Sequence, residues 1–444
     1  MVSVFWFRRD LRIKDHPALF QALASGDEIL LVATADTLGA RFSELSTIRQ
    51  NSLRASWREL KKSLSGKLTI LESPKDLVAL AQSMGIRSVY VSSAFDSQGF
   101  KELAAIERDL QSSETKLIRG EGNYAVSPGR VRKSDGTPYR VYTPFFNEWV
   151  KLDPGTPIPE GNLSAAMPEV ESSFNARLEL SVGILAGEEY ALKTLERFLD
   201  SRVDAYADMR NRADVGGTSH LSHALSHGEI HPRTILSRLG NGSGESVFRK
   251  EIAWREFYAD VMWHNPETLT DYLNPKFAEM KYDFDEQIFA KWCSGQTGYP
   301  MVDAGMRQLL QDGWMHNRVR MIVASFLVKD LHFEWQHGAK WFEQNLTDFD
   351  PASNSHGWQW TAGCGTDASP YYRVFNPVMQ GLKFDPNGDY VRKYIPELSH
   401  LTGANAHEPW EDPHGYSKGY PKRIVDHAEE RNESLRRLEA IKTA

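Results

Sequence analysis

The sequence predicts a two-part fold, in which an α/β domain with a doubly wound parallel sheet precedes an all-helical domain. Up to residue 120, short apolar runs rich in β-branched and aromatic residues alternate with segments of helical spacing. From residue 188 onwards strand alternation is almost absent, and apolar residues recur at helical offsets. The chain has 444 residues, which is long for one hydrophobic core and agrees with more than one domain.

Four apolar runs in the first part are expected to be strands. They comprise residues 2–7, 28–34 and 67–71 and the run around Val89. Residues 45–64 and 74–85 lie between these runs and have helical spacing, with Gly or Pro at their ends. Strands that alternate with helices in this order form a parallel, doubly wound sheet, which we expect to span residues 1–120.

Residues 121–187 are rich in Pro, Gly and Ser, and we expect them to form a linker that is partly ordered by its aromatic residues. The helical domain should then span residues 188–444. Val302, Met306, Leu309 and Leu310 follow helical offsets, and so do Val319, Ile322, Val323, Phe326 and Leu327.

Composition limits the classes of protein that need considering. The only cysteines are Cys293 and Cys364, which excludes a disulfide framework and a cysteine-rich zinc site. There is no recognisable signal peptide and no apolar run of about 18 residues, so we expect a soluble, cytoplasmic protein without a membrane partner. The net charge of -7 means that any nucleic acid would have to bind a local basic patch.

Two conspicuous patterns favour a structural interpretation. The glycine-rich stretch 240–246 follows a helical pattern instead of a strand, so we expect a flexible loop and no phosphate site. A second stretch holds the histidines His220, His223, His227 and His231. Because Gly228 and Pro232 interrupt this helical pattern, and no carboxylate or cysteine within it is counted as a ligand, we expect packing or surface histidines and no metal site.

Three further segments interleave aromatic with polar residues, which core packing alone explains poorly. Glu251 and Trp254 share one helix face, and Trp314 precedes the polar pair Asn317 and Arg318. The third segment is "DFDPASNSHGWQWTAGCGTDASPYYRVFNP", residues 348–377. In addition, "GGTSHLS" at residue 216 could open a helix and receive a phosphate, although most such starts are simple caps.

Over nearly its whole length the sequence resembles the photolyase and cryptochrome family, in particular the microbial class I-type photolyases that act on cyclobutane pyrimidine dimers. The motifs that carry this resemblance are "VFWFRRDLRIKDHPAL", "YRVYTPF", "GGTSHLS", "WREFY", "GYPMVDAGMRQL", "GWMHNRVRM", "GWQWTAGCGTD", "FNPVMQGLKFD" and "YIPEL". The resemblance implies an N-terminal antenna domain and a helical domain that binds a U-shaped FAD, active in its reduced anionic form.

The family's FAD contacts match Tyr206, Thr218, Ser219, Leu221, Ser222, Arg320, Asp348, Asp350 and Asn354. By the resemblance, Arg320 and Asp348 form a pair beside the isoalloxazine ring, and Asn354 faces its reactive nitrogen. A neutral amide at that place can accept a hydrogen bond from a protonated flavin.

The resemblance implies light-driven dimer repair, with a blue-light receptor as the alternative. Trp254 and Trp360 match the walls around the flipped dimer, Met321 a thioether contact, and Glu251 the carboxyl that bonds the dimer. Plant-type cryptochromes replace these tryptophans and usually have Asp in place of Asn354. Relatives specific for the (6-4) photoproduct carry histidines in the segment that holds Asn317 and Met321 here, so dimer repair is favoured.

The expected partner is ultraviolet-damaged DNA, bound by a monomer. Arg210, Arg318 and Arg373 match positions that hold the damaged strand, and Lys383, Arg392 and Lys393 could extend the patch.

Trp358 and Trp335 match the first two members of the family's electron route to the flavin. The distal member is Tyr282, where the family has Trp. For the antenna, Gly99 occupies the place where folate-binding relatives carry Glu, so a deazaflavin or a flavin nucleotide is favoured over folate, with an empty cleft as the remaining alternative. Asp36, Asp96 and Phe100 are candidate antenna contacts, because they lie at or after the ends of expected strands.

Overall fold

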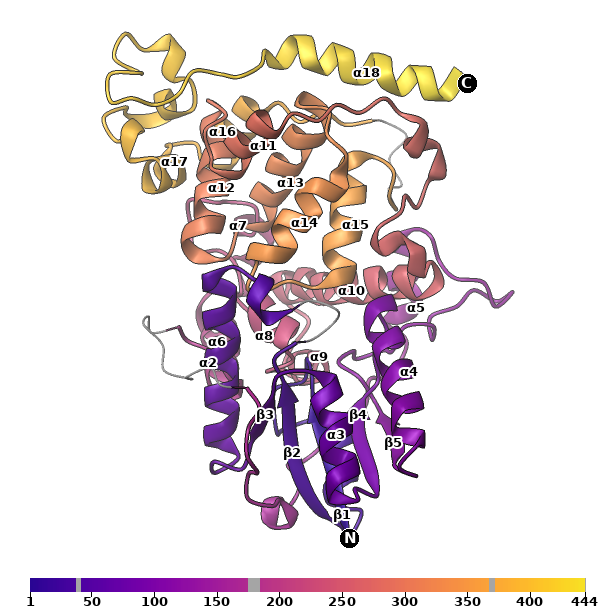
Figure 1. Ribbon diagram of the computed structural model, residues 1–444. Helices are drawn as coiled ribbons and strands as arrows, with labels where there is room; N and C mark the ends of the chain where they lie inside the picture. Colours follow the sequence, from indigo (N-terminus) through magenta and orange to yellow (C-terminus); the bar gives the residue numbers. More distant parts are fainter. Residues whose placement is uncertain (37–40, 175–183, 367–371, 444) are drawn as a thin grey trace. The chain divides into compact units, whose positions relative to one another are not determined.

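The computed structural model describes residues 1–36, 41–174, 184–366 and 372–443 (Figure 1). The chain divides into two compact units. Unit 1 comprises residues 1–204 and 219–266, and unit 2 comprises residues 205–218 and 267–444. Among the described residues, no helix is both long enough and apolar enough to cross a membrane.

A parallel sheet of five strands forms the centre of unit 1 (Figure 1). The strands are β1 (Val2–Phe7), β2 (Glu28–Thr34), β3 (Thr69–Leu71), β4 (Ser88–Ser92) and β5 (Lys116–Gly120), in the spatial order β3-β2-β1-β4-β5. Phe5 of β1 pairs with Leu31 of β2 on one side and with Tyr90 of β4 on the other. The predicted parallel, doubly wound sheet is therefore confirmed.

Successive side chains of each strand enter two separate cores, one on each face of the sheet. Phe5 and Phe7 pack in one core with residues of α1 (Pro17–Leu23) and α2 (Thr47–Ser63). Val4 and Trp6 pack in the other with residues of α3 (Pro74–Met84) and α4 (Ser97–Gln111). Because helices cover both faces, the strands read as continuous apolar runs.

The predicted linker is more ordered than its composition suggested. It contains α5 (Tyr142–Trp149), and Trp149 and Phe145 of this helix are buried. Further on, the backbone N–H of Met167 donates to the carbonyl of Ile29 in β2, at 2.9 Å. Residues 175–183 of the predicted linker lie outside the described part of the chain.

Unit 1 also contains four later helices, which lie beyond the predicted domain boundary at residue 187. These are α6 (Glu188–Ser201), α8 (Ser222–His227), α9 (Pro232–Leu236) and α10 (Ser243–His264). The change from strands to helices does occur near the predicted boundary, but the boundary itself stays a prediction. The stretch 240–246 is not wholly a flexible loop: Ser243 begins α10, and the Glu245 carboxylate accepts the N–H groups of Gly240 and Gly242 at 2.8 Å each.

Unit 2 consists of helices and their connections, with no strand among its described residues. Its helices are α7 (Tyr206–Met209), α11 (Glu286–Cys293), α12 (Pro300–Asp312), α13 (Asn317–Ser325), the π-helix η5 (Phe326–Asp330), α14 (Trp335–Asn345), α15 (Pro351–Ala362), α16 (Pro377–Phe384), α17 (Asp389–Tyr394) and α18 (His427–Thr443). The predicted apolar stripe of α12 is buried at Val302, Met306 and Leu309, whereas Leu310 is 42% exposed. The predicted stripe that begins at Val319 is fully buried and continues from α13 into η5.

Short 3₁₀ helices complete the two units. They are η1 (Phe42–Glu44), η2 (Leu163–Ala165), η3 (Pro266–Leu269), η4 (Pro275–Glu279), η6 (Pro396–Leu398), η7 (Gly403–His407) and η8 (Pro409–Glu411).

Candidate functional site

A partly buried ion pair in unit 2 joins α13 to the segment before α15. The Nη2 atom of Arg320 donates to Oδ2 of Asp348 at 2.7 Å, and its Nε donates to the carbonyl of Met315 at 2.8 Å. The Asp348 side chain is 2% exposed, and its second oxygen, Oδ1, has no hydrogen-bond partner among the described residues. An unsatisfied buried carboxylate oxygen is costly, so this atom is suited to accept a hydrogen bond from a ligand.

The start of α15 orients the next two predicted cofactor residues. Asp350 caps this helix by accepting the N–H of Ser353 at 2.9 Å, and Pro351 occupies the first helical position, which needs no N–H donor. One turn later, the Nδ2 atom of Asn354 donates to the carbonyl of Ala339 at 3.1 Å. This bond fixes the amide orientation and leaves Oδ1 as the atom that can accept from a ligand.

The two tryptophans of the third aromatic segment lie on different faces of α15. Trp358 is 2% exposed and packs edge-on against Phe342, with ring centroids 5.0 Å apart. Trp360 is only half-buried, and the guanidinium of Arg373 lies 5.6 Å from its ring centroid. Trp360 and Arg373 also line a hollow of about 250 Å³ in unit 2.

Lys329 and Tyr372, which the sequence argument did not identify, line the same hollow. The Lys329 side chain is buried, its Nζ lies 4.0 Å from the Tyr372 ring centroid, and it donates to the carbonyl of Arg373. Residues 367–371, which include the last residue of the "GWQWTAGCGTD" motif, lie outside the described part of the chain.

The predicted electron-route residues Trp335 and Tyr282 are bridged by a tyrosine that the sequence argument missed. Tyr272 packs edge-on against Trp335, with centroids 6.3 Å apart, and stacks on Tyr282 at 6.2 Å. The Tyr272 hydroxyl donates to Oε1 of Glu334 at 3.1 Å, whereas the Tyr282 hydroxyl donates to the carbonyl of Phe277 at 3.1 Å. Burial raises the pKa of both tyrosines above their ordinary value.

The other two predicted DNA-binding arginines of unit 2 each place their guanidinium group over an aromatic ring. Arg318 lies over Phe384 at 4.6 Å and donates two hydrogen bonds to Oδ1 of Asn211, at 3.2 and 2.8 Å. Burial, followed by repulsion from Arg210, lowers the pKa of Arg318. Arg210 lies 5.8 Å from the ring of Tyr206, a buried member of the predicted cofactor set.

The face of α13 beside these arginines carries the remaining predicted contacts of unit 2. Asn317 is exposed and Met321 is half-buried, and they lie four positions apart on α13. Among the cations proposed to extend the patch, Lys383 and Lys393 are exposed, while Arg392 is bound to Asp389 by an ion pair of 2.5 Å.

In unit 1, Glu251 and Trp254 are three positions apart on α10, and both are half-buried. The Trp254 indole stacks on the ring of Tyr142 at 3.7 Å, with an angle of 8° between the planes. Tyr142 therefore covers one face of Trp254, and only the other face can contact a flat ligand. Tyr142 lies in the "YRVYTPF" motif, but its side-chain contact could not be foreseen from the sequence.

The predicted cofactor set is divided between the two units. Tyr206, Thr218, Arg320, Asp348, Asp350 and Asn354 belong to unit 2, and Ser219, Leu221 and Ser222 belong to unit 1. Ser222 begins α8, and the Ser219 hydroxyl accepts the N–H of Leu221 at 3.4 Å. In unit 2, a Cβ at Gly217 would lie 2.6 Å from the carbonyl oxygen of Met209, so a larger residue would displace the backbone before Thr218.

A small hollow of about 50 Å³ lies where β1 and β4 end, at the topological switch point of the sheet. Arg8, Asp10 and Asp96 line it. Although burial alone would raise it, the pKa of Asp10 is lowered to about 2, because His16, Ser92 and the Arg8 backbone bind the carboxylate. An anionic Asp10 is therefore expected throughout the neutral range.

The three predicted antenna contacts differ in their surroundings. Asp96 caps α4 through the N–H of Gly99 at 2.7 Å, and Asp36 accepts the N–H of Phe42 at 2.8 Å, so both have local structural roles. Phe100 is 45% exposed and packs edge-on against Trp263 at 6.1 Å. A Cβ at Gly99 would lie 2.9 Å from both Ala94 Cβ and Asp96 Oδ2, so a glutamate there would require these neighbours to move.

Comparison with known proteins relates both parts of the chain to one family. Residues 3–163 match the family described as DNA photolyase, and residues 248–440 match the FAD binding domain of DNA photolyase. The deoxyribodipyrimidine photo-lyase of Alkalihalophilus pseudofirmus is 37% identical over 98% of this chain and 97% of its own length.

Solved structures agree with this relationship. A class III photolyase from Agrobacterium tumefaciens has a TM-score of 0.88 and 36% identity, covering 100% of this chain and 98% of its own. A photolyase from Sulfolobus tokodaii with two FAD molecules gives 0.84 and 25%, covering 99% and 100%. A cryptochrome from Synechocystis gives 0.86 and 27%, covering 98% of each chain.

Proposed function

The chain belongs to the DNA photolyase family, and on this premise we propose that it is a deoxyribodipyrimidine photo-lyase, which uses light to repair cyclobutane pyrimidine dimers in DNA. The observation that carries this proposal is that Trp360 and Arg373 lie side by side in one hollow of unit 2. The ring of Trp360 is half-buried and lines this hollow of about 250 Å³, so a flat apolar wall lies beside a cation. A flipped base needs such a wall, and its phosphate needs such a charge.

FAD fits the described residues of unit 2. The unpartnered Oδ1 of Asp348 and the oriented Oδ1 of Asn354 are acceptors without a competing donor among the described residues, and a flavin ring offers N–H groups to such acceptors. Bound in its reduced anionic form, FAD supplies the electron that light transfers to the dimer. The remaining contacts, Tyr206, Thr218, Ser219, Leu221, Ser222, Arg320 and Asp350, are proposed from the resemblance.

The dimer is held by residues whose roles differ. Trp254 and Trp360 each present a flat ring to the flipped bases, and Met321 adds a polarisable thioether. The Glu251 carboxyl, when protonated, donates a hydrogen bond to the dimer and stabilises the negative charge of its radical anion. After the cyclobutane bonds break, the transferred electron returns, so the reaction has no net redox change.

The damaged strand is bound through its phosphates by Arg210, Arg318 and Arg373, with little sequence preference. We propose that the protein acts as a monomer in the cytoplasm.

A second chromophore in unit 1 is proposed as an antenna, with a deazaflavin or a flavin nucleotide favoured over folate. The restricted space at Gly99 and the second FAD of the Sulfolobus tokodaii relative support this choice.

A blue-light receptor without repair activity is the second candidate, because the chain is also similar to the Synechocystis cryptochrome. Illumination of the reduced, flavin-bound protein with a dimer-containing oligonucleotide separates the two functions. Repair restores thymine absorbance. Absence of restoration under blue light, with flavin present, would exclude the enzyme and leave the receptor.

Glu251→Ala tests the proposed site more closely. We expect this variant to keep its flavin spectrum and to lose most of its repair yield, because the dimer anion loses a hydrogen-bond donor. Glu196→Ala, which removes an exposed carboxylate from α6 of the same unit, is the matched control. Equal repair by both variants would remove the role given to Glu251.

A further inference from the structure

Two histidines and a glutamate of unit 1 lie close together in the segment that was expected to hold no metal. His223 and His227 are one turn apart on α8. Gly228 ends this helix in the left-handed conformation, with φ of 66°, and turns the chain so that Glu229 faces back to the histidines. Gly228 was expected only to interrupt the helical pattern, and the expectation that the stretch offers no carboxylate ligand was wrong, because the turn brings Glu229 to the cluster.

The distances in this cluster suit a shared metal ion. The Nε2 atom of His223 is hydrogen-bonded to Nδ1 of His227 at 3.1 Å and lies 3.7 Å from Oε1 of Glu229, so a bound ion would displace the proton shared by the two rings. One ligand atom from each residue lies within 4.8 Å of the other two. Bonds from zinc to nitrogen or oxygen are about 2.0 to 2.2 Å long, so two atoms bound to one ion lie roughly 3 to 4.4 Å apart.

The surroundings of the Glu229 carboxylate favour the binding of a cation. This residue is 1% exposed, and neither carboxylate oxygen has a hydrogen-bond partner among the described residues. A buried carboxylate without close hydrogen bonds is unfavourable unless a cation compensates its charge. The Nε2 atom of His223 lies 3.7 Å from Oε1 of Glu229, which is too long for a hydrogen bond but within ion-pair distance.

A serine fixes the orientation of the first histidine. The Ser52 hydroxyl on α2 is fully buried and lies 3.3 Å from Nδ1 of His223. If Nδ1–H donates to this hydroxyl, the lone pair of Nε2 points to His227 and Glu229. Metal-binding histidines commonly have such a partner on their second ring nitrogen.

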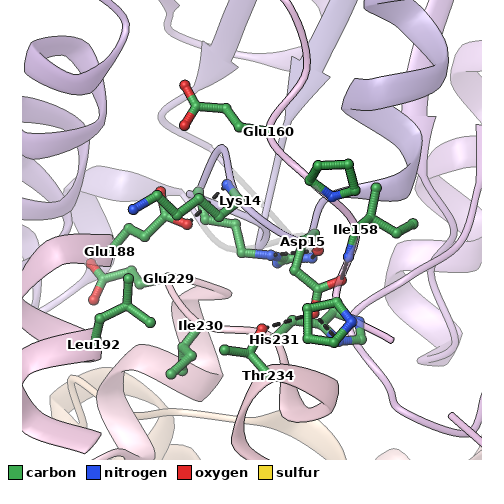
Figure 2. A pocket seen from close by; sticks show the side chains of 13 residues that line it. Lys14, Asp15, Ile158, Glu160, Glu188, Leu192, Glu229, Ile230, His231 and Thr234 are labelled. Atoms are coloured by element: carbon green, nitrogen blue, oxygen red, sulfur yellow. Dashed lines mark hydrogen bonds and ion pairs between the residues drawn. The ribbon is translucent and has the colours of Figure 1, made fainter. Parts of the chain in front are cut away.

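One member of the cluster, Glu229, also lines a cavity. This cavity in unit 1 has a volume of about 280 Å³, and Figure 2 shows Glu229 beside Glu188 and Leu192. The His223 side chain is 19% exposed, so the cluster is open to solvent at this residue.

We propose that His223, His227 and Glu229 bind one divalent transition-metal ion of the zinc class, with solvent in the fourth position. Two imidazoles and one carboxylate are ligands that suit zinc and its neighbours better than calcium or magnesium. The ion joins α8 to the turn after it and, through Ser52, to α2. It therefore stabilises unit 1 independently of the proposed repair reaction.

Calorimetric titration of the full chain with Zn²⁺, after removal of metals with a chelator, tests this site. We expect one ion per chain and a higher melting temperature in the presence of Zn²⁺. Glu229→Gln and His227→Asn should each weaken binding by more than ten-fold, and Ser52→Ala by roughly ten-fold, the low end for loss of a supporting hydrogen bond. His220→Asn is the matched control, because it removes an exposed histidine of the same segment.

Absence of one-to-one binding by the wild type would overturn the proposal. Zn²⁺ binding by Glu229→Gln and His227→Asn with wild-type affinity would also overturn it. Circular dichroism verifies that each variant is folded. If either buried variant fails to fold, His223→Asn at the partly exposed position replaces it. Loss of Zn²⁺ binding by this variant supports the site, and Zn²⁺ binding with wild-type affinity excludes it.

Discussion

Trp358 and Trp360 show how closely spaced residues take separate roles. A helix turns by about 200° over two positions, so these rings lie on opposite faces of α15. Trp358 faces the core, where Phe342 packs against it, and Trp360 faces the hollow with Arg373. The alternation of buried and half-buried rings places a candidate electron carrier and a candidate substrate wall on one rigid element.

We expect Tyr272 to supply electrons to Trp335 more effectively than Tyr282 does. An oxidised tyrosine must release its phenolic proton, and the Glu334 carboxylate that Tyr272 contacts is a far better proton acceptor than the carbonyl that Tyr282 contacts. We therefore predict that Tyr272→Phe slows photoreduction of the flavin several-fold and more than Tyr282→Phe does. The rate is measured from flavin absorbance under blue light with an external reductant.

Tyr190→Phe, on α6 of unit 1, serves as the control for loss of a tyrosine hydroxyl. If Tyr282→Phe slows the reaction while Tyr272→Phe leaves it unchanged, the order of the two tyrosines is wrong.

At the scale of elements, strands that are buried on both faces could be predicted from the sequence, because every one of their positions tends to be apolar. The strands β1 and β2 are covered on both faces, so their apolar runs predict the bounds 2–7 and 28–34 that the structure shows. The edge strand β5 was not predicted, because it is half exposed and carries Lys116 and Arg119. The stacking of Trp254 on Tyr142 was not predictable either, since it joins two elements far apart in the chain.

Gly338 allows α14 to approach α15 closely. A Cβ at this position would lie 2.1 Å from Cη2 of Trp358, which is far inside van der Waals contact. We predict that Gly338→Ala lowers the free energy of unfolding by about 1 to 3 kcal/mol, because α14 or the indole must move. Urea denaturation measures this change. The control Gly357→Ala meets no atom within 4 Å and should raise stability by about 0.5 to 1 kcal/mol. A stabilising effect of Gly338→Ala would show that the two helices can separate without cost.

Glu256 on α10 anchors the segment that was predicted to be a linker. Its carboxylate accepts the N–H groups of Ala125 at 2.5 Å and Val126 at 3.0 Å, and the indole N–H of Trp149 at 2.6 Å. Burial raises the pKa of Glu256 from 4.5 to about 7, and these bonds offset only part of the shift.

The folded protein therefore retains a proton on Glu256 that the unfolded chain releases above pH 4.5. Its contribution to stability is complete below that pH and is lost as the pH rises to about 7, by at most about 3 kcal/mol. Glu256→Gln should remove this decline, so the difference in unfolding free energy between wild type and variant should shrink as the pH rises. Urea denaturation across this range measures it, and a constant difference would contradict the shifted pKa.

At the scale of the whole molecule, the division into units depends on packing that periodicity does not reveal. The period of the apolar residues changes near residue 188, but α6, α8, α9 and α10 form one compact unit with the sheet. The net charge does not reveal a local DNA-binding patch either. The chain carries -7, yet the three predicted strand-binding arginines all belong to unit 2, and each lies over an aromatic ring.

Since the overall charge repels DNA, affinity has to come from a few local phosphate contacts, and each should be visible in the salt dependence of binding. We predict that Arg373→Ala weakens binding to all sequences equally and lowers the slope of log affinity against log salt by roughly 0.7 to 0.9, the value for one lost phosphate contact. Fluorescence anisotropy with a dimer-containing oligonucleotide at several salt concentrations measures the slope. Arg108→Ala, an exposed arginine on α4 of unit 1, should leave the slope unchanged. A slope that changes for Arg108→Ala but not for Arg373→Ala would move the strand-binding face from unit 2 to unit 1, because only residues that displace counterions from the DNA affect it.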